Sequence, residues 1–180
     1  MSQIEDRVLA PLFRRLDNML ARGVLRGTRD GGGVQNMQVG LLEGELADKV
    51  ERVQVYGLSS VPPNGGDCVV AFLQGNRDHG MILSVNDRAS RPRNLAVGEV
   101  VLYNDQNCKV TLDRQGTITT VTDNTTVSQT REGDISIEGT QNLVVKGGVA
   151  MTIEAPNILI RGDVLLEGNL HATGSITSDG

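Results

Sequence analysis

The last third of the chain, residues 117–180, restricts the possible folds more than any other segment. It holds no aromatic residue and no cysteine, yet apolar residues recur in it as pairs two positions apart. The pairs are Ile135/Ile137, Leu143/Val145, Met151/Ile153, Ile158/Ile160, Val164/Leu166 and Leu170/Ala172, and Ile176 begins one more. Side chains two apart lie on one face of a strand, so each pair predicts a very short strand with one buried face. Such strands cannot close a core alone and must stack into a solenoid or wind together with other chains.

The spacing of these pairs shortens along the segment. The first members are eight apart from Ile135 to Leu143 and Met151, and six apart from Ile158 onward. Shorter rungs make a narrower rod, so we expect a taper toward the C-terminus. The residues between the pairs are rich in Thr, Ser, Asn, Asp and Gly, which suit tight turns and exposed strand faces.

Composition favours β-structure or an oligomer over a large globular core. The 180 residues include two Tyr, two Phe and no Trp, so the chain must bury aliphatic side chains and extend its backbone pairing. A net charge of −5 gives no support for a broad nucleic-acid footprint. The N-terminus is locally basic through Arg7, Arg14, Arg15, Arg22, Arg26 and Arg29. Without interleaved aromatics, these arginines indicate a solvated helix face or partner contacts.

The two cysteines, Cys68 and Cys108, are far apart, and no signal peptide is recognisable. We therefore expect reduced thiols in a protein made in the cytoplasm, with a disulfide between them as the less favoured alternative. No apolar run approaches the roughly 20 residues that span a bilayer.

The opening segment, residues 1–22, predicts an amphipathic helix. Its apolar positions are Ile4, Val8, Leu9, Leu12, Phe13, Leu16, Met19 and Leu20. Ser2 and Glu5 form a capping-box pattern, and Gly23 is the expected stop. Pro11 should kink the helix or divide it in two. The apolar stripe needs a partner, which is either the chain's own β-domain or a neighbouring subunit.

Residues 23–95 follow a β pattern that suits a small barrel of the OB type. The expected strands are Gly23–Arg29, Gln35–Leu42, Glu51–Gly57, Asp67–Leu73 and Gly80–Val85. The glycine-rich Asp30–Gly33 is interpreted as a hairpin turn, because no helix or GK[ST] follows it as in a phosphate-binding loop. We expect residues 96–116 to form a neck with strands at Gly98–Tyr103 and Lys109–Leu112, and residues 117–180 to form a β-helical rod.

This order of parts resembles a known family. Three stretches carry the resemblance: Ala21–Val24 at the start of the barrel, Val69–Leu73 with the Gly-Asn-Arg-Asp-His-Gly turn at 75–80, and Gly98–Gln106 in the neck. They are similar to the baseplate assembly protein V family of Mu-like phages, the central tail spike of contractile tails. The resemblance covers nearly the whole chain and contains no catalytic motif.

The resemblance implies a homotrimer on the tail axis, with a trimeric β-helix or β-prism needle. Such a trimer caps the tail tube, contacts the baseplate hub and tube proteins, and pierces the host outer membrane when the sheath contracts. The protein would be a virion component made in the host cytoplasm, with no catalytic residue, no cofactor site and no nucleic-acid partner. The family also implies a tip where His-x-His motifs from three chains bind iron. No His-x-His occurs in these 180 residues, so iron is expected only if a tip segment follows Gly180.

Three alternatives compete with a spike. In a hexapeptide-repeat acyltransferase, His171 would be the candidate general base. On its expected strand, however, His171 points away from the apolar pair and is interpreted as a surface residue. Three-fold symmetry can bring three copies of His171 near one axis, so a metal site there stays an open alternative. A cell-wall hydrolase would need a carboxylate pair, but Glu132, Asp134 and Glu138 are spaced like a solvated face, and His79 lies in a turn. An OB-fold module for saccharide or nucleic acid would need aromatic platforms, whereas Tyr56 and Phe72 fit a core better.

Overall fold

The computed structural model describes residues 3–177. The chain divides into two units, Met1–Asn142 and Leu143–Gly180, and all described helices and strands belong to the first. They are α1 (Gln3–Asp17), β1 (Leu20–Arg29), β2 (Asn36–Gly40), η1 (Leu42–Gly44), β3 (Leu46–Arg52), β4 (Asp67–Phe72), η2 (Leu73–Gly75), β5 (Gly80–Asn86), β6 (Val100–Tyr103), β7 (Lys109–Leu112), β8 (Ile118–Val121), β9 (Thr125–Gln129) and β10 (Ile135–Gly139). No helix among residues 3–177 is long and apolar enough to cross a membrane.

The N-terminal helix is present but shorter than expected. It runs through Pro11 as one element, so the division into two does not occur, and it ends at Asp17 rather than near Gly23. Leu20 was predicted to be helical and instead begins β1, because it pairs with Ala71 of β4. Pairing with β4 thus places Leu20 in a strand, although the sequence pattern predicted it to be helical. The capping residue Ser2 and the side chains of Ile4, Glu5 and Val8 lie outside those described.

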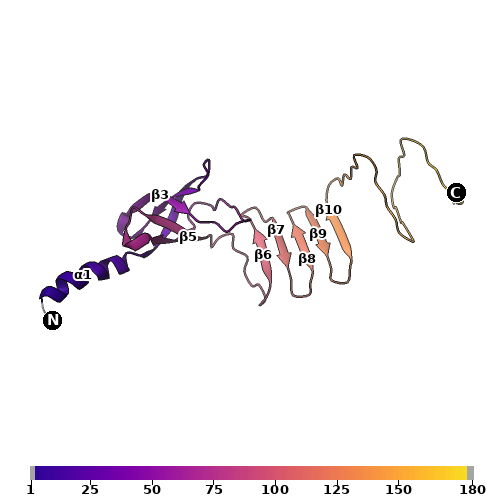
Figure 1. Ribbon diagram of the computed structural model, residues 1–180. Helices are drawn as coiled ribbons and strands as arrows, with labels where there is room; N and C mark the ends of the chain where they lie inside the picture. The colour runs from indigo at the N-terminus through magenta and orange to yellow at the C-terminus, as the bar shows by residue number, and fades with distance from the viewer. Residues whose placement is uncertain (1–2, 178–180) are drawn as a thin grey trace. The chain divides into compact units, whose positions relative to one another are not determined.

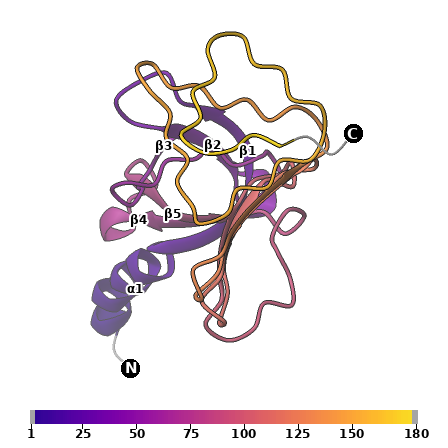
Figure 2. The same ribbon diagram turned by 90° about the vertical axis from the view of Figure 1, so that its right-hand side faces the viewer.

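The expected small five-stranded barrel is confirmed. The strands close in the order β1-β2-β3-β5-β4, and Figure 2 shows them curving around one core. All pairs are antiparallel except β3 with β5. Bulges interrupt the β1–β2, β2–β3 and β4–β5 ladders. The core is aliphatic with one aromatic ring, and its members are Leu25, Met37, Val39, Val50, Cys68, Val70, Phe72 and Ile82.

The third barrel strand was predicted too late in the chain. Glu51–Gly57 was expected, whereas β3 spans Leu46–Arg52. Its ladder with β2 ends at the Asn36–Glu51 pair, and β2 does not extend further, so residues beyond Arg52 have no such partner. Tyr56 is consequently fully exposed instead of buried, while Phe72 does lie in the core. The hairpin turn at Asp30–Gly33 is confirmed, since it joins the antiparallel strands β1 and β2.

Strands β6 to β10 form an antiparallel meander in which each strand pairs with the next (Figure 1). The expected neck strand Lys109–Leu112 is β7, and the first apolar pair, Ile135 and Ile137, lies on β10. Side chains stabilise the intervening turns. Asn104 Oδ1 accepts hydrogen bonds from the backbone N–H groups of Gln106 and Cys108, at 2.9 and 3.0 Å.

The second unit has no strand or helix within residues 143–177. The short strands expected at the apolar pairs from Leu143 onward are therefore not formed by one chain. Their large side chains remain between 54% and 72% exposed. A strand needs a neighbour to satisfy its backbone, and no neighbour pairs with this segment in a single chain. The needle and its taper remain predictions.

Candidate assembly surface

The β6–β10 sheet has one apolar face, which follows from its register. Val100 pairs with Leu112, Leu112 with Ile118, Ile118 with Gln129, and Gln129 with Ile135. Paired residues and those two positions away share a face. The apolar members of this face, hereafter the apolar sheet face, are Val100, Leu102, Val110, Leu112, Ile118, Val127, Ile135 and Ile137. The other face is the more polar one: it carries Thr, Ser, Lys109 and Glu138 together with Val101, Tyr103 and Val121.

No segment described in the first unit covers the apolar sheet face, of which only Val110 and Val127 are half-buried. Leu102 is 61% exposed, Ile118 43% and Ile135 68%, although all three lie within regular strands. Contiguous exposed apolar surface on a folded element marks an interaction site more often than it marks a free surface. The paired apolar residues of the second unit are exposed to the same degree. The first unit therefore presents an exposed apolar strand face, and the second unit presents exposed apolar pairs on a segment without strands.

A second exposed apolar surface lies on α1. Leu9, Leu12, Phe13 and Leu16 are between 42% and 61% exposed. These residues recur at helical spacing and form one stripe, hereafter the α1 stripe. The chain's own barrel was one of two expected partners for it, and this barrel leaves it uncovered.

The α1 helix is nevertheless attached firmly at its C-terminal end. Gly75 of η2 lies against the backbone of Arg15, so closely that a Cβ there would meet the Arg15 carbonyl. The Phe72 N–H donates to the Met19 carbonyl at 2.8 Å. These contacts fix the path of the chain from the helix into β1.

Arg77, in the Gly-Asn-Arg-Asp-His-Gly turn, joins three segments at this attachment. Its guanidinium donates to Asn18 Oδ1 at 3.2 Å and lies 3.6 Å from Glu45 Oε2. It also stacks over Phe72, 4.7 Å from the ring centre. The turn that carried much of the family resemblance therefore has a structural role in orienting α1.

A polar network that the sequence analysis missed holds the long connection from Val53 to Gly66. Gln35, only 6% exposed, donates to Asp30 at 2.7 Å and accepts from Arg52 at 3.0 Å. Arg52 also donates to Ser60 Oγ at 3.0 Å. Burial lowers the pKa of the Arg52 guanidinium from its ordinary value, an effect that Cys68 and Asp30 partly offset. Gln35 was expected as the first residue of the strand Gln35–Leu42, and nothing in the sequence marked it as part of a buried polar network.

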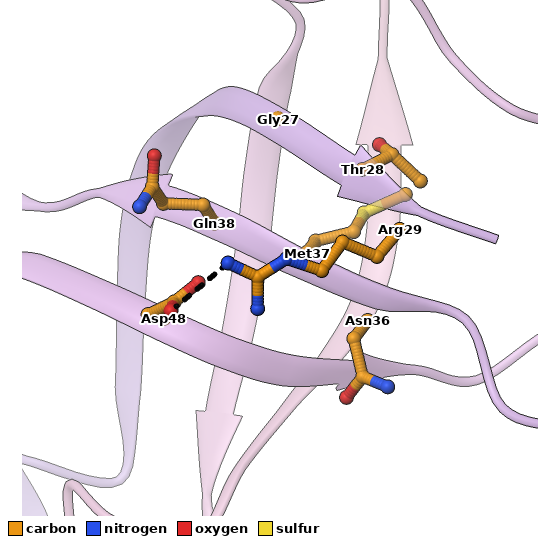
Figure 3. A pocket seen from close by; sticks show the side chains of 7 residues that line it. All are labelled: Gly27, Thr28, Arg29, Asn36, Met37, Gln38 and Asp48. Carbon is orange, nitrogen blue, oxygen red and sulfur yellow. Dashed lines mark hydrogen bonds and ion pairs between the residues drawn. The ribbon is translucent and has the colours of Figure 1, made fainter. Parts of the chain in front are cut away.

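A shallow cavity of about 170 Å³ lies on β1, β2 and β3 of the barrel (Figure 3). Its lining residues are Gly27, Thr28, Arg29, Asn36, Met37, Gln38 and Asp48. Arg29 reaches across β2 to Asp48, with 3.4 Å between Nη2 and Oδ2, so these two charges already satisfy each other. The lining contains no aromatic ring on which a base or sugar could stack.

The remaining sequence candidates are not gathered into a site. His79 is exposed in the turn before β5, and His171 is exposed in the other unit. Glu132 and Asp134 are exposed in the turn before β10, and Glu138 accepts only from Ser136 on its own strand, at 3.1 Å. Among residues 3–177, no three His, Cys, Asp or Glu side chains are grouped closely enough to hold a metal ion.

Comparisons with known proteins agree with this picture of an assembly component. The family described as "Bacteriophage Mu Gp45, N-terminal" matches residues 22–89, which contain the barrel strands except the first two residues of β1. The chain is 36% identical over 174 residues to a protein of Escherichia phage Mu named "Baseplate puncturing device gp45", covering 97% of this chain and 79% of that protein. It is 37% identical over 114 residues to "Mu-like prophage FluMu protein gp45" of Haemophilus influenzae, covering 63% of this chain and 62% of that one.

Proposed function

The chain belongs to the bacteriophage Mu Gp45 family, and we propose that it forms the central spike of a contractile-tail baseplate. It is a structural protein of the phage tail and not an enzyme. The relative in phage Mu is named a puncturing device. By extension, the present chain would cap the tail tube and pierce the host outer membrane when the sheath contracts.

The observation that carries this proposal is the apolar sheet face together with the exposed pairs of residues 143–177. A single chain of this composition would leave a large apolar surface in water. Three copies around one axis can direct these faces inward, and each copy can supply strand neighbours to the other two. The proposed assembly is therefore a homotrimer, with a tapering β-helix or β-prism needle built from residues 117–180.

Such a needle would act mechanically. An intertwined prism pairs most of its backbone internally and exposes few strand edges at which it could open. Aliphatic faces meeting on one axis resist lateral separation, while outward Thr, Ser, Asp and Glu keep the surface hydrated. Force from the sheath could then pass along the axis without unfolding the protein. No residue needs to perform chemistry for this task.

The partners proposed for this assembly are those of a tail tip. The barrel unit would face the baseplate hub and tail-tube proteins, and the needle would touch the host outer membrane transiently. The proposed location is the tail baseplate of the virion, after synthesis in the host cytoplasm. The residues present do not fit an iron tip, because His171 is a lone histidine and no His-x-His occurs. No step of the mechanism uses a metal.

An OB-fold binding module is the second candidate, favoured by the cavity on β1–β3 and by the fully exposed Tyr56. Tyr56 lies on the connection after β3, whereas the cavity is lined by residues of β1, β2 and β3 without any aromatic. A filter assay that retained oligonucleotide or glycan would support this candidate.

The decisive experiment is the mass of the full chain in solution by light scattering. Three times the chain mass of 19.3 kDa is expected, together with a trimer band that resists SDS without heating. A monomer with the same elution at all concentrations would overturn the spike proposal.

A further inference from the structure

The α1 helix cannot be stable through its own contacts. It has 15 residues with Pro11 in the middle, and isolated helices of this length are marginal in water even without proline. Its attachment to the barrel is at one end, through η2. The α1 stripe therefore requires a covering surface that the described residues of the first unit do not supply.

The anchored geometry excludes a fold-back onto the chain's own barrel. Gly75 and the backbone of Arg15 are in direct contact, and Arg77 holds Asn18 in the turn that follows the helix. To lay the stripe on its own barrel, the helix would have to swing about this turn and break those contacts. Of the two partners expected from the sequence, this leaves the neighbouring subunit.

The α1 stripe has the spacing of a helix-bundle seam. Leu9, Leu12 and Leu16 occupy a, d and a positions of a heptad repeat, and Phe13 lies beside them. Arg7 and Arg14 are seven residues apart and both exposed. At 100° per residue, Arg14 lies about 160° around the helix from Leu16. Identical helices that pack around an axis bring identical charges together, so Arg7 and Arg14 on the outer face suit self-association, while Arg15 flanks the seam at a g position.

We propose that the three α1 helices of the trimer pack against one another through Leu9, Leu12 and Leu16 as a parallel three-helix bundle. This inference rests on the proposed trimer. A seam of three positions, little more than one heptad, is too short for free helices to associate. Three helices tied to one assembled trimer, however, meet at a high effective concentration, so a short seam suffices.

Position-matched cysteines test the bundle in the full-length chain. Cys108, which is partly exposed, is first replaced (Cys108→Ser), and Cys68 stays buried in the core. Leu16→Cys is then compared with Arg14→Cys under mild oxidation. Equivalent seam residues of parallel helices come close enough for a disulfide, which needs Cα atoms within about 7 Å, whereas residues on the outer face do not. A disulfide-linked dimer band on a non-reducing gel is expected for Leu16→Cys and only background for Arg14→Cys.

Light scattering of the same samples separates this inference from the trimer itself. Trimer mass without linkage at residue 16 would overturn the bundle and leave the spike proposal intact, since α1 would then be covered by a barrel or another baseplate protein. Equal linkage for both variants would also overturn the bundle, because it would show a freely moving helix. Monomer mass would overturn both proposals. Leu9→Cys, one heptad earlier, repeats the test in case Leu16→Cys disturbs the fold, and linkage is expected there too.

Discussion

Gly75 packs directly on Arg15: a Cβ built on Gly75 would lie 2.9 Å from the Arg15 Cα, closer than real side chains approach. Gly75 also has a φ of +69°, in the left-handed region. The end of α1 thus rests on a position where both the space and the backbone conformation favour glycine. With the Phe72–Met19 and Arg77–Asn18 hydrogen bonds, this contact sets where the N-terminal helix leaves the barrel.

Replacing Gly75 should loosen the helix. Gly75→Ala is expected to cost at least about 1–2 kcal/mol from the left-handed backbone alone, with a further loss as Arg15 moves away. The measurements are the free energy of unfolding and the rate of proteolytic cleavage near Arg14 and Arg15, which should rise. Gly31→Ala is the matched control, because a Cβ there meets nothing within 4 Å. Similar losses for both variants would contradict this account.

Removing Arg77 should destabilise the same junction by a different route. Arg77→Ala loses the hydrogen bond to Asn18, the ion pair with Glu45 and the stacking on Phe72, and we expect a loss of about 1–2 kcal/mol in unfolding free energy. Arg29→Ala breaks a single exposed ion pair and should cost about 0.5 kcal/mol or less. Chemical denaturation checks both values. Equal effects would mean that the three contacts of Arg77 do not act together.

A charge on the apolar sheet face should prevent assembly. Ile118 and Thr119 are neighbours on β8 that point to opposite faces, so Ile118→Asp and Thr119→Asp differ mainly in the face that carries the carboxylate. Ile118→Asp is expected to weaken the trimer by more than about tenfold in dissociation, or ~1.4 kcal/mol, while Thr119→Asp leaves it assembled. Sedimentation across a concentration series measures both. Dissociation by Thr119→Asp alone would place the interface on the other face.

Two neighbouring substitutions in the second unit give a similar comparison. Ile160→Asp places a carboxylate on an expected buried face of the needle, and Arg161→Asp places one on the next residue, which the alternation directs outward. Ile160→Asp should reduce the β signal in circular dichroism and remove SDS resistance, whereas Arg161→Asp should retain both. Unchanged SDS resistance in Ile160→Asp would show that these pairs do not form the needle interior.

Alkaline pH should destabilise the barrel through Cys68. Burial, and secondarily Asp67, raise the pKa of this thiol above its ordinary value of 9.0. As the pH rises past 9.0, the unfolded chain loses the thiol proton before the folded chain does, so the free energy of unfolding decreases. Cys68→Ala should remove this part of the pH dependence, and Cys108→Ser should keep it. The measurement is the denaturation midpoint between neutral and alkaline pH.

Local sequence patterns predicted most barrel and neck strands, because the residues between these strands are types that favour turns. Asn104, Asp113 and the glycine-rich Asp30–Gly33 supply turn chemistry next to alternating apolar residues, and β7 was located at its observed bounds. The patterns gave wrong bounds where pairing with another strand determines which residues join the sheet. Leu20 continues a helical stripe yet joins β1, and Tyr56 continues an alternating run yet lies beyond the end of its ladder partner.

The candidate surfaces were only partly visible in the sequence. The paired apolar residues indicated strand faces that need a partner, and the apolar positions of residues 1–22 predicted an amphipathic helix. Neither pattern could show that these faces stay exposed in one chain, because exposure depends on which elements happen to pack on them. The Arg52–Gln35–Ser60 network was invisible beforehand, since its three members are brought together only by the barrel.

The sequence by itself determined most of the elements and most of the apolar positions that need covering, because periodicity and turn chemistry act over a few neighbouring residues; Leu20 and Tyr56 are the exceptions. The tertiary structure alone decided the register that gathers eight apolar side chains of five strands onto one sheet face, and the Gly75–Arg15 contact that directs α1 away from its barrel. Both depend on contacts between residues far apart in the chain, whose geometry no local pattern encodes.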